Sequence, residues 1–154
     1  MARAFIGLGA NLGERERTLR HALEIVDDLE GVAVAAVSSF RETEPVEYLD
    51  QPRFVNAAAA LTTELPPLAL LHALLDVERE LGRTRAGPRY GPRTVDLDLL
   101  LYDDIVLAEP GLSIPHPRLH ERRFVLEPLV ELDPHLIVPG RGAAAEILRD
   151  LRDS

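Results

Sequence analysis

The stretch RTVDLDLLLYDD, residues 93–104, places Asp96 and Asp98 within an otherwise apolar run. Successive side chains of a β-strand point to opposite faces, so residues two apart share a face and lie about 6.6 Å apart along the backbone. We therefore predict a strand whose two carboxylates are aligned on one face. Its alternating apolar residues are predicted to point to the core: Val95, Leu97, Leu99 and Leu101.

The segments before this strand carry one strand pattern and one helix pattern. Residues 4–9, AFIGLG, form a short apolar run that ends in glycines and is typical of a strand. Residues 13–31 have helical periodicity, and Gly31 is placed to end the helix. The apolar face predicted for this helix contains Leu19, Ala22, Leu23, Val26 and Leu29.

Two further strands and a second helix follow. Residues 32–41 and 53–64 have strand composition and flank the polar, proline-bearing segment 42–52, which is long for a plain hairpin. Pro66 and Pro67 can start a helix that runs to Gly82. The residues at helical spacing there are Leu68, Leu71, Leu74, Leu75, Glu78 and Leu81. The order strand, helix, strand, strand, helix, strand predicts a ferredoxin-like α+β fold, a mostly antiparallel sheet with helices packed on it.

The remaining chain adds smaller elements. Residues 104–109 are predicted to form a short returning strand, and residues 143–154 a terminal helix. Within residues 120–134 we expect Pro128 to disturb a regular helix. No repeat, linker or low-complexity tract interrupts the sequence, so residues 1–154 are predicted to form a single domain.

The composition excludes several classes of function. The 154 residues include no cysteine and no lysine, which rules out disulfides, thiol nucleophiles, cysteine-held zinc, a P-loop lysine and a lysine Schiff base. A net charge of −9 argues against nucleic-acid binding, and no apolar run is long enough to span a membrane. We expect a soluble cytoplasmic protein, and the sequence does not indicate an oligomeric state.

The glycine-rich stretch GLGANLG, residues 7–13, follows a predicted strand and precedes a helix, as a dinucleotide-binding loop does. Gly7 and Gly9 fit that fingerprint, but the third glycine would have to stand at Leu12 and instead stands at Gly13. The second strand also lacks the terminal acid that would bind a ribose. A tight turn before the first helix is the favoured interpretation.

Charges of both signs meet around the opening stretch. Residues 79–93 contain five arginines and one acid, and they lead directly to Asp96 and Asp98. Aligned carboxylates suit a divalent cation, and guanidinium groups suit phosphate oxygens. The pattern indicates a metal-bound polyphosphate, although a solvated acidic face beside a surface salt-bridge network would leave the same pattern. The histidine-containing segment 114–124, IPHPRLHERRF, adds His116 and Arg122 as candidates.

An ordered set of motifs resembles the 6-hydroxymethyl-7,8-dihydropterin pyrophosphokinase family of folate biosynthesis. These are GLGANLG, SSFRETEPV (38–46), DQPRFVNAA (50–58), GRTR (82–85), GPRTVDLDLLLYDD (91–104) and IPHPRLHERRFVLEPL (114–129). The resemblance implies transfer of a pyrophosphoryl group from ATP to the pterin hydroxymethyl group, with release of AMP. It also implies two Mg²⁺ ions on Asp96 and Asp98, and loops at 42–52 and 83–92 that close over bound substrate.

The resemblance further implies roles for individual residues. Arg83 and Arg93 would steady the transferred phosphates. The nucleotide site would be lined by Glu78, Arg85, Leu99, Ser113, His116 and Arg122, with Tyr90 closing over it. The pterin would be held by Thr43, Val46, Phe54, Asn56 and Phe124, where Asn56 reads the amide edge and the two phenylalanine rings stack.

Two other interpretations of the residues stay open. A two-metal phosphohydrolase would explain the aspartates and arginines but not Asn56 or the aromatic loops. A non-catalytic ferredoxin-like ligand-sensing domain would leave the strand carboxylates solvated and without a role.

Overall fold

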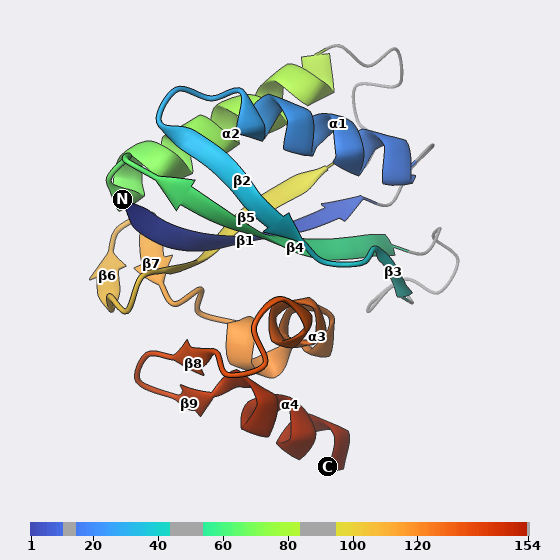
Figure 1. The fold of residues 1–154 in the computed structure, drawn as a ribbon, viewed down its shortest axis with the longest axis vertical. Helices are drawn as coiled ribbons and strands as arrows, with labels where there is room; N and C mark the ends of the chain where they lie inside the picture. Colours follow the sequence, from blue (N-terminus) through green and yellow to red (C-terminus); the bar gives the residue numbers. More distant parts are fainter. Residues whose placement is uncertain (11–14, 44–53, 84–94, 154) are drawn as a thin grey trace.

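An antiparallel sheet forms the middle layer of the computed structural model, which describes residues 1–10, 15–43, 54–83 and 95–153 (Figure 1). Within the described residues the sheet has the strand order β2–β4–β1–β5, with the short β3 also paired to β4. Its strands are β1 (Ala2–Ala10), β2 (Val32–Val37), β3 (Arg41–Thr43), β4 (Phe54–Thr63) and β5 (Asp96–Tyr102). With α1 (Arg15–Asp27) and α2 (Pro67–Arg83), this is the predicted ferredoxin-like order, and the predicted fold class is confirmed.

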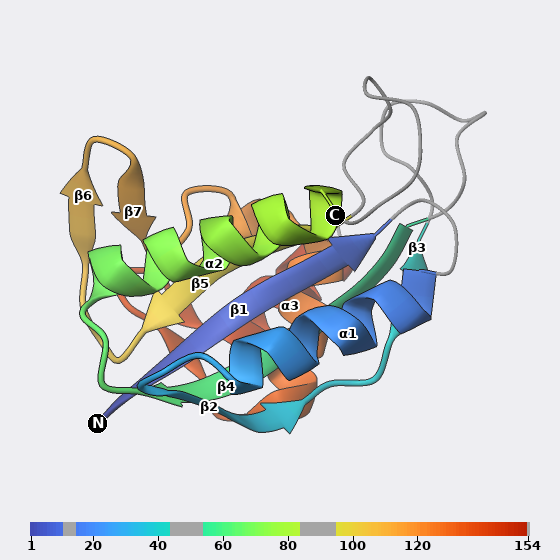
Figure 2. The same cartoon turned by 90° about the horizontal axis from the view of Figure 1, so that it is seen from above.

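Helices cover both faces of the sheet. Helices α1 and α2 lie on one face, and α3 (Arg123–Leu132) and α4 (Ala144–Asp153) lie on the other (Figures 1 and 2). The sheet therefore has a core on each side, and the core under α3 and α4 includes Phe5, Leu100 and Leu126. Sequence periodicity predicted one apolar face for the strand 93–104, whereas a covered sheet needs apolar residues on both faces.

Small elements connect these layers. They are β6 (Leu107–Glu109), β7 (Leu112–Ile114), a 3₁₀ turn (Leu119–Glu121), β8 (Ile137–Val138) and β9 (Gly142–Ala143). The predicted returning strand is shorter than expected, and it pairs with β7 rather than running back along the sheet. None of the described helices combines the length and apolar composition that a membrane crossing requires.

The predicted apolar face is correct for α1 and only partly correct for α2. In α1 the fully buried residues are Leu19, Ala22 and Val26, as the spacing predicts. In α2 the predicted Leu74 and Leu81 are buried, and so are Leu70 and Val77, which were not predicted. The predicted Leu68 is 47% exposed. Leu68 is only the second residue of that helix, where its side chain precedes the turns that pack on the sheet.

A β-bulge in β5 contradicts the predicted orientation of Leu101. Ile6 pairs with Leu99 but Phe5 pairs with Leu101, so Leu100 is an extra residue in β5. Beyond a bulge the alternation of faces is shifted by one residue. Leu101 therefore packs with Phe5 under α3 and α4, while Leu97 and Leu99 pack under α1 and α2.

Two other expectations also fail. The strand predicted over 32–41 is interrupted after Val37, because the Ser38 hydroxyl accepts a hydrogen bond from the Ala58 N–H and replaces a backbone carbonyl of the ladder. Pro128 does not break α3, which continues to Leu132. Its neighbours Leu126 and Leu129 are fully buried against the sheet, so tertiary packing outweighs the lost backbone bond.

The second core supplies a stability test. Leu126→Ala is expected to lower the free energy of unfolding by about 2–5 kcal/mol, because it removes a fully buried side chain. Leu68→Ala is the matched control, a leucine in an exposed helix position that should change stability by less than about 1 kcal/mol. Urea denaturation measures both. Equal effects of the two substitutions would contradict the assignment of a core beneath α3.

Candidate functional site

One row of residues crosses three strands at the end of β1. Gly9 of β1 pairs with Asn56 of β4 on one side and with Asp96 of β5 on the other. Directly paired residues on antiparallel strands project to the same face. A Cβ at Gly9 would lie 3.0 Å from Oδ1 of Asn56, tighter than nine in ten real Cβ contacts, so the amide would have to shift. Glycine at this position therefore lets the Asn56 amide occupy the space between the strands.

The next row on the same face repeats the arrangement. Gly7 pairs with Ala58 and with Asp98, so the second carboxylate also stands opposite a glycine. Asp96 and Asp98 consequently share a face, as the alternation predicts. That face is polar at these two rows and becomes the apolar core of α3 and α4 further along, where Phe5 and Leu100 are buried.

Glu78 of α2 fixes the backbone between the two aspartates. Its Oε2 accepts a hydrogen bond from the N–H of Leu97 at 2.6 Å. β5 is an edge strand of the sheet, and its outward N–H groups need partners from elsewhere. Glu78 thus supports the strand that presents both carboxylates.

His116 is held beside this face by the bulge of β5. Its backbone N–H donates to the Leu100 carbonyl at 2.9 Å, and its Nδ1 accepts the N–H of Arg118 at 3.2 Å. Because Nδ1 is an acceptor, the proton of the neutral ring is on Nε2. Burial lowers the pKa of His116, and Arg122 and Arg118 lower it further, while Asp98 acts in the opposite direction. His116 is therefore a neutral Nε2–H donor at pH 7.

Arg122 and Phe124 stand together at the start of α3. The guanidinium carbon of Arg122 lies 5.6 Å from the centre of the Phe124 ring, within cation–π range. Arg122 is also close enough to His116 to affect its charge. The first turn of α3 therefore brings a cation and an aromatic ring to the same neighbourhood.

The other predicted site residues fall into three groups. Ser113 is half-buried on β7, and Leu99 is buried beneath α1 and α2, on the face opposite to the aspartates. Only the backbone is described for Arg83 at the end of α2 and for Thr43 and Phe54, which pair between β3 and β4. Outside the described residues lie Val46, Arg85, Tyr90 and Arg93.

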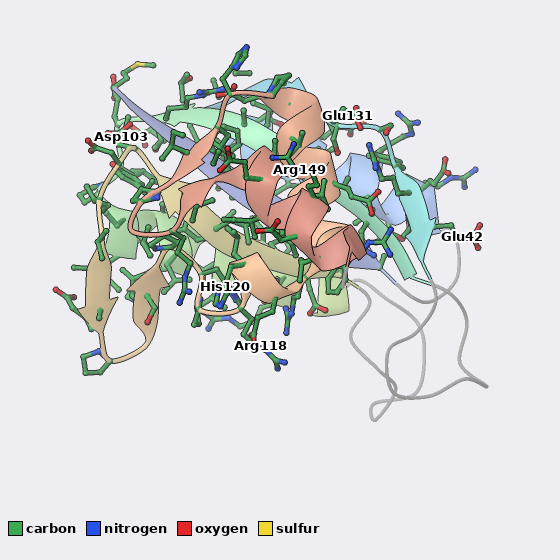
Figure 3. The ribbon with its side chains drawn as sticks, turned by 90° about the horizontal axis from the view of Figure 1, so that it is seen from below. Glu42, Asp103, Arg118, His120, Glu131 and Arg149 are labelled. Carbon is green, nitrogen blue, oxygen red and sulfur yellow. The ribbon has the colours of Figure 1, made fainter. Side chains whose placement is uncertain are left out.

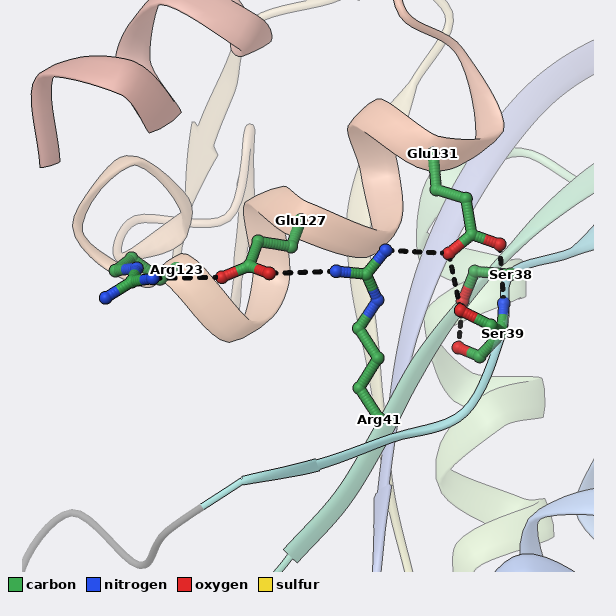
Figure 4. Close-up of polar contacts among 6 residues, drawn as sticks. All are labelled: Ser38, Ser39, Arg41, Arg123, Glu127 and Glu131. Carbon is green, nitrogen blue, oxygen red and sulfur yellow. Dashed lines mark hydrogen bonds and ion pairs between the residues drawn. The ribbon is translucent and has the colours of Figure 1, made fainter. Parts of the chain in front are cut away.

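A polar network that we call the α3 clamp joins Ser39, Arg41, Glu127 and Glu131 (Figure 4). Arg41 Nη1 donates to Glu127 at 2.8 Å, and its Nη2 donates to Glu131 at 2.9 Å. Glu131 also accepts the backbone N–H of Ser39 at 2.7 Å and the Ser39 hydroxyl at 2.6 Å. These bonds tie α3 to the corner between β2 and β3.

Sequence reasoning missed the clamp. The available signal was the pair Glu127 and Glu131, four residues apart on a helix whose other residues are mostly apolar. Nothing in the sequence indicates that their partner is Arg41, which is more than eighty residues away in the chain. Figure 3 views the sheet from the α3 and α4 side, with Glu131 well separated from Arg118 and His120.

Enzymes that transfer phosphate-containing groups need carboxylates for a metal and cations for phosphate in one place. This end of the sheet brings Asp96 and Asp98 near His116 and Arg122. Comparison with known proteins shows which family of such enzymes the chain belongs to. Residues 5–134 match the model of the 7,8-dihydro-6-hydroxymethylpterin-pyrophosphokinases, and the chain belongs to that family. The resemblance that the motifs indicated is confirmed.

Several relatives carry the same family name. The 2-amino-4-hydroxy-6-hydroxymethyldihydropteridine pyrophosphokinase of Bacillus subtilis is 47% identical over 84% of this chain and 77% of its own length. The Pseudomonas aeruginosa protein of that name is 43% identical, over 95% and 90% of the two chains. Folic acid synthesis protein fol1 of Schizosaccharomyces pombe is 41% identical over 88% of this chain, which spans only 18% of that protein.

A solved structure agrees with the fold. The HPPK-DHPS chain crystallised in complex with substrates matches 97% of this chain with a TM-score of 0.78, and this chain covers 43% of it. At 12% sequence identity this likeness supports the ferredoxin-like architecture alone.

We predict that the α3 clamp stabilises the folded protein in a pH-dependent way. Hydrogen bonds from Ser39 and then Arg41 lower the pKa of Glu131 below its ordinary value of 4.5. A lowered folded-state pKa means that the stabilisation is fully present above 4.5 and is lost as pH falls through the folded value. Glu131→Gln should therefore destabilise the protein at neutral pH but not at strongly acidic pH.

Urea denaturation between about pH 7 and pH 3 measures this difference. Glu30→Gln, at an exposed turn after α1, is the control and should behave as the wild type throughout. A Glu131→Gln deficit of constant size across that range would show that the charge of Glu131 contributes nothing.

Proposed function

We propose that this chain transfers the pyrophosphoryl group of ATP to the hydroxymethyl group of 6-hydroxymethyl-7,8-dihydropterin. The hydroxyl oxygen forms a bond to the β-phosphorus, the bond from that phosphorus to the oxygen shared with the α-phosphate breaks, and AMP leaves. The hydroxyl proton is released to solvent. The observation that carries the proposal is the alignment of Asp96, Gly9 and Asn56 in one row, with Asp98 beside it, in a chain of this family.

Asp96 and Asp98 are the groups that would hold Mg²⁺. Both are oxygen donors, which Mg²⁺ prefers, and it commonly binds through one or two carboxylates together with substrate phosphates. Among the described residues no cluster of three or more His, Cys, Asp or Glu could form a cage by itself, so the donor set fits a metal that arrives with ATP. Two bound ions would neutralise phosphate charge and polarise the β-phosphorus.

The nucleotide half of the site would use the residues around His116. Its Nε2–H can donate to a phosphate oxygen, and Arg122 can add a charge-assisted bond nearby. Ser113 on β7 would complete the wall, and Leu99 could contribute only through its backbone, since its side chain faces the other core. Glu78 would act by holding Leu97 and hence the aspartates.

The arginine-rich segment would add to this half. Arg83 and Arg93 are proposed to steady the transferred phosphates, with Arg85 and Tyr90 over the nucleotide. These roles rest on the motif resemblance. Arg83 is the last residue of α2, and the other three residues lie outside the described residues.

The pterin half would lie at the other end of the same row. Asn56 is only 9% exposed, and its amide supplies both a donor and an acceptor for the pterin amide edge. Phe124 on α3 and Phe54 at the start of β4 are proposed to stack on the ring faces, with Thr43 and Val46 beside them. The pterin hydroxymethyl group would then point along the row from Asn56 toward Asp96.

A product assay separates this function from the alternatives. The chain is incubated with ATP, Mg²⁺ and hydroxymethyldihydropterin, and the nucleotides are resolved. AMP formation that depends on the pterin supports the transferase. Release of ADP or phosphate without pterin supports a phosphohydrolase, and absence of turnover supports a ligand-sensing domain.

Asp96→Asn and Asp98→Asn are each expected to lower turnover by at least about a hundredfold, because loss of a carboxylate removes part of the metal's several-kcal/mol stabilisation of transition-state charge. Asp104→Asn, the same change at an exposed turn after β5, is the matched control and should leave turnover unchanged. Steady-state AMP production measures all three, and unfolding curves verify the fold. Wild-type turnover in either strand variant would contradict the metal assignment.

A further inference from the structure

Arg41 bridges two elements that carry proposed pterin contacts. In the sheet, Arg41 of β3 pairs with Asn56 of β4, so its side chain leaves the sheet on the same face as the Asn56 amide. On the helix, its guanidinium binds Glu127, which follows Phe124 by three residues and lies nearly one turn further along α3. One side chain therefore connects the strand position beside Asn56 to the helix that presents Phe124.

The planar guanidinium of Arg41 controls how α3 is oriented on the sheet. Nη1 and Nη2 of Arg41 bind different carboxylates, on Glu127 and Glu131, at 2.8 and 2.9 Å (Figure 4). Two bonds from one planar group fix both the position and the rotation of α3, which a single ammonium cannot do. Without a cation between them, the two carboxylates at i and i+4 would repel each other.

The clamp is more than a means of attaching α3. The fully buried Leu126 and Leu129 already anchor the helix to the sheet. Arg41 is 34% exposed at its side chain, and its Nε is buried without a hydrogen-bond partner among the described residues. The two carboxylate bonds of Arg41 therefore add orientation to a helix that is already attached to the sheet.

A second arginine holds α3 at a different place. Arg3 of β1 donates to Asp133, the residue after the last turn of α3, at 3.1 Å. This single bond joins the far end of the helix to the end of the sheet where β1 begins, away from Asn56 and Asp96. The two ties attach the same helix but only Arg41 also pairs with the strand position of Asn56.

We propose that Arg41 is a positioning residue for the dihydropterin, setting the separation between Phe124 on α3 and Asn56 on β4. The inference rests on the proposed function, because it assigns these two residues to the pterin. It adds that the position of the pterin-binding residues depends on a contact outside the pterin half. The nucleotide half is built on β5, β7 and His116 and includes only Arg122, the residue before the first turn of α3, which Arg41 does not contact.

The test compares Arg41→Ala, Arg41→Lys and Arg3→Ala in the full chain. Arg41→Ala is expected to raise the KM for hydroxymethyldihydropterin about tenfold while leaving the KM for ATP within about twofold. Arg41→Lys retains the charge but can satisfy only one carboxylate well, so its KM for the pterin should be intermediate. Arg3→Ala also removes an arginine–carboxylate tie to α3, and both of its KM values should match the wild type.

Other results of this test would overturn the role proposed for Arg41. Equal rises in both KM values, or the same KM change in Arg3→Ala, would reduce Arg41 to a general stabiliser and overturn the proposal. If Arg41→Ala fails to fold, Glu127→Gln and Glu131→Gln weaken the clamp separately, and an unchanged pterin KM in both overturns it. If the wild type makes no AMP, the proposed function fails first, and calorimetric binding of the pterin to the same proteins then decides the role of Arg41.

Discussion

The pairing register that places Gly9 between Asn56 and Asp96 is the constraint on which the site depends. It brings a buried amide and a carboxylate into one row with no side chain between them. A slip of one residue along either neighbouring strand would turn its polar groups to the opposite face, into the core under α1 and α2. The register is secured because both faces of β1 are packed, with Ile6 and Leu8 on one side and Phe5 on the other.

β5 contributes both to the candidate site and to the two hydrophobic cores. Its first residues present Asp96 and Asp98 opposite glycines, and its last residues fill two separate cores through the extra residue Leu100. The same bulge leaves the Leu100 carbonyl to accept the N–H of His116, so the irregularity that shifts the alternation also fixes a histidine beside the carboxylates. The bulge at Leu100 therefore contributes both to the packing of the core and to the position of His116.

Sequence patterns predicted the ferredoxin-like order and the shared face of the aspartates because these follow from local periodicity. They did not predict the orientation of Leu101, since a bulge depends on how Phe5 and Ile6 pair across the sheet. Nor did they predict the break after Val37, which arises from the Ser38 hydroxyl bonding Ala58. The contacts from Arg41 to α3 and from Glu78 to Leu97 were missed for the same reason: long-range partners leave little trace in local sequence.

The family motifs identified the candidate residues, and the geometry explains why small residues accompany them. The most direct test of the account is the value of kcat/KM for hydroxymethyldihydropterin in Gly9→Ala, whose added Cβ would stand 3.0 Å from Oδ1 of Asn56. We predict a fall of at least about tenfold with the fold retained, because displacement of a substrate-orienting group by less than 1 Å has effects of that order or larger. A Gly9→Ala protein with wild-type kcat/KM would contradict the claim that this row of the sheet forms the site.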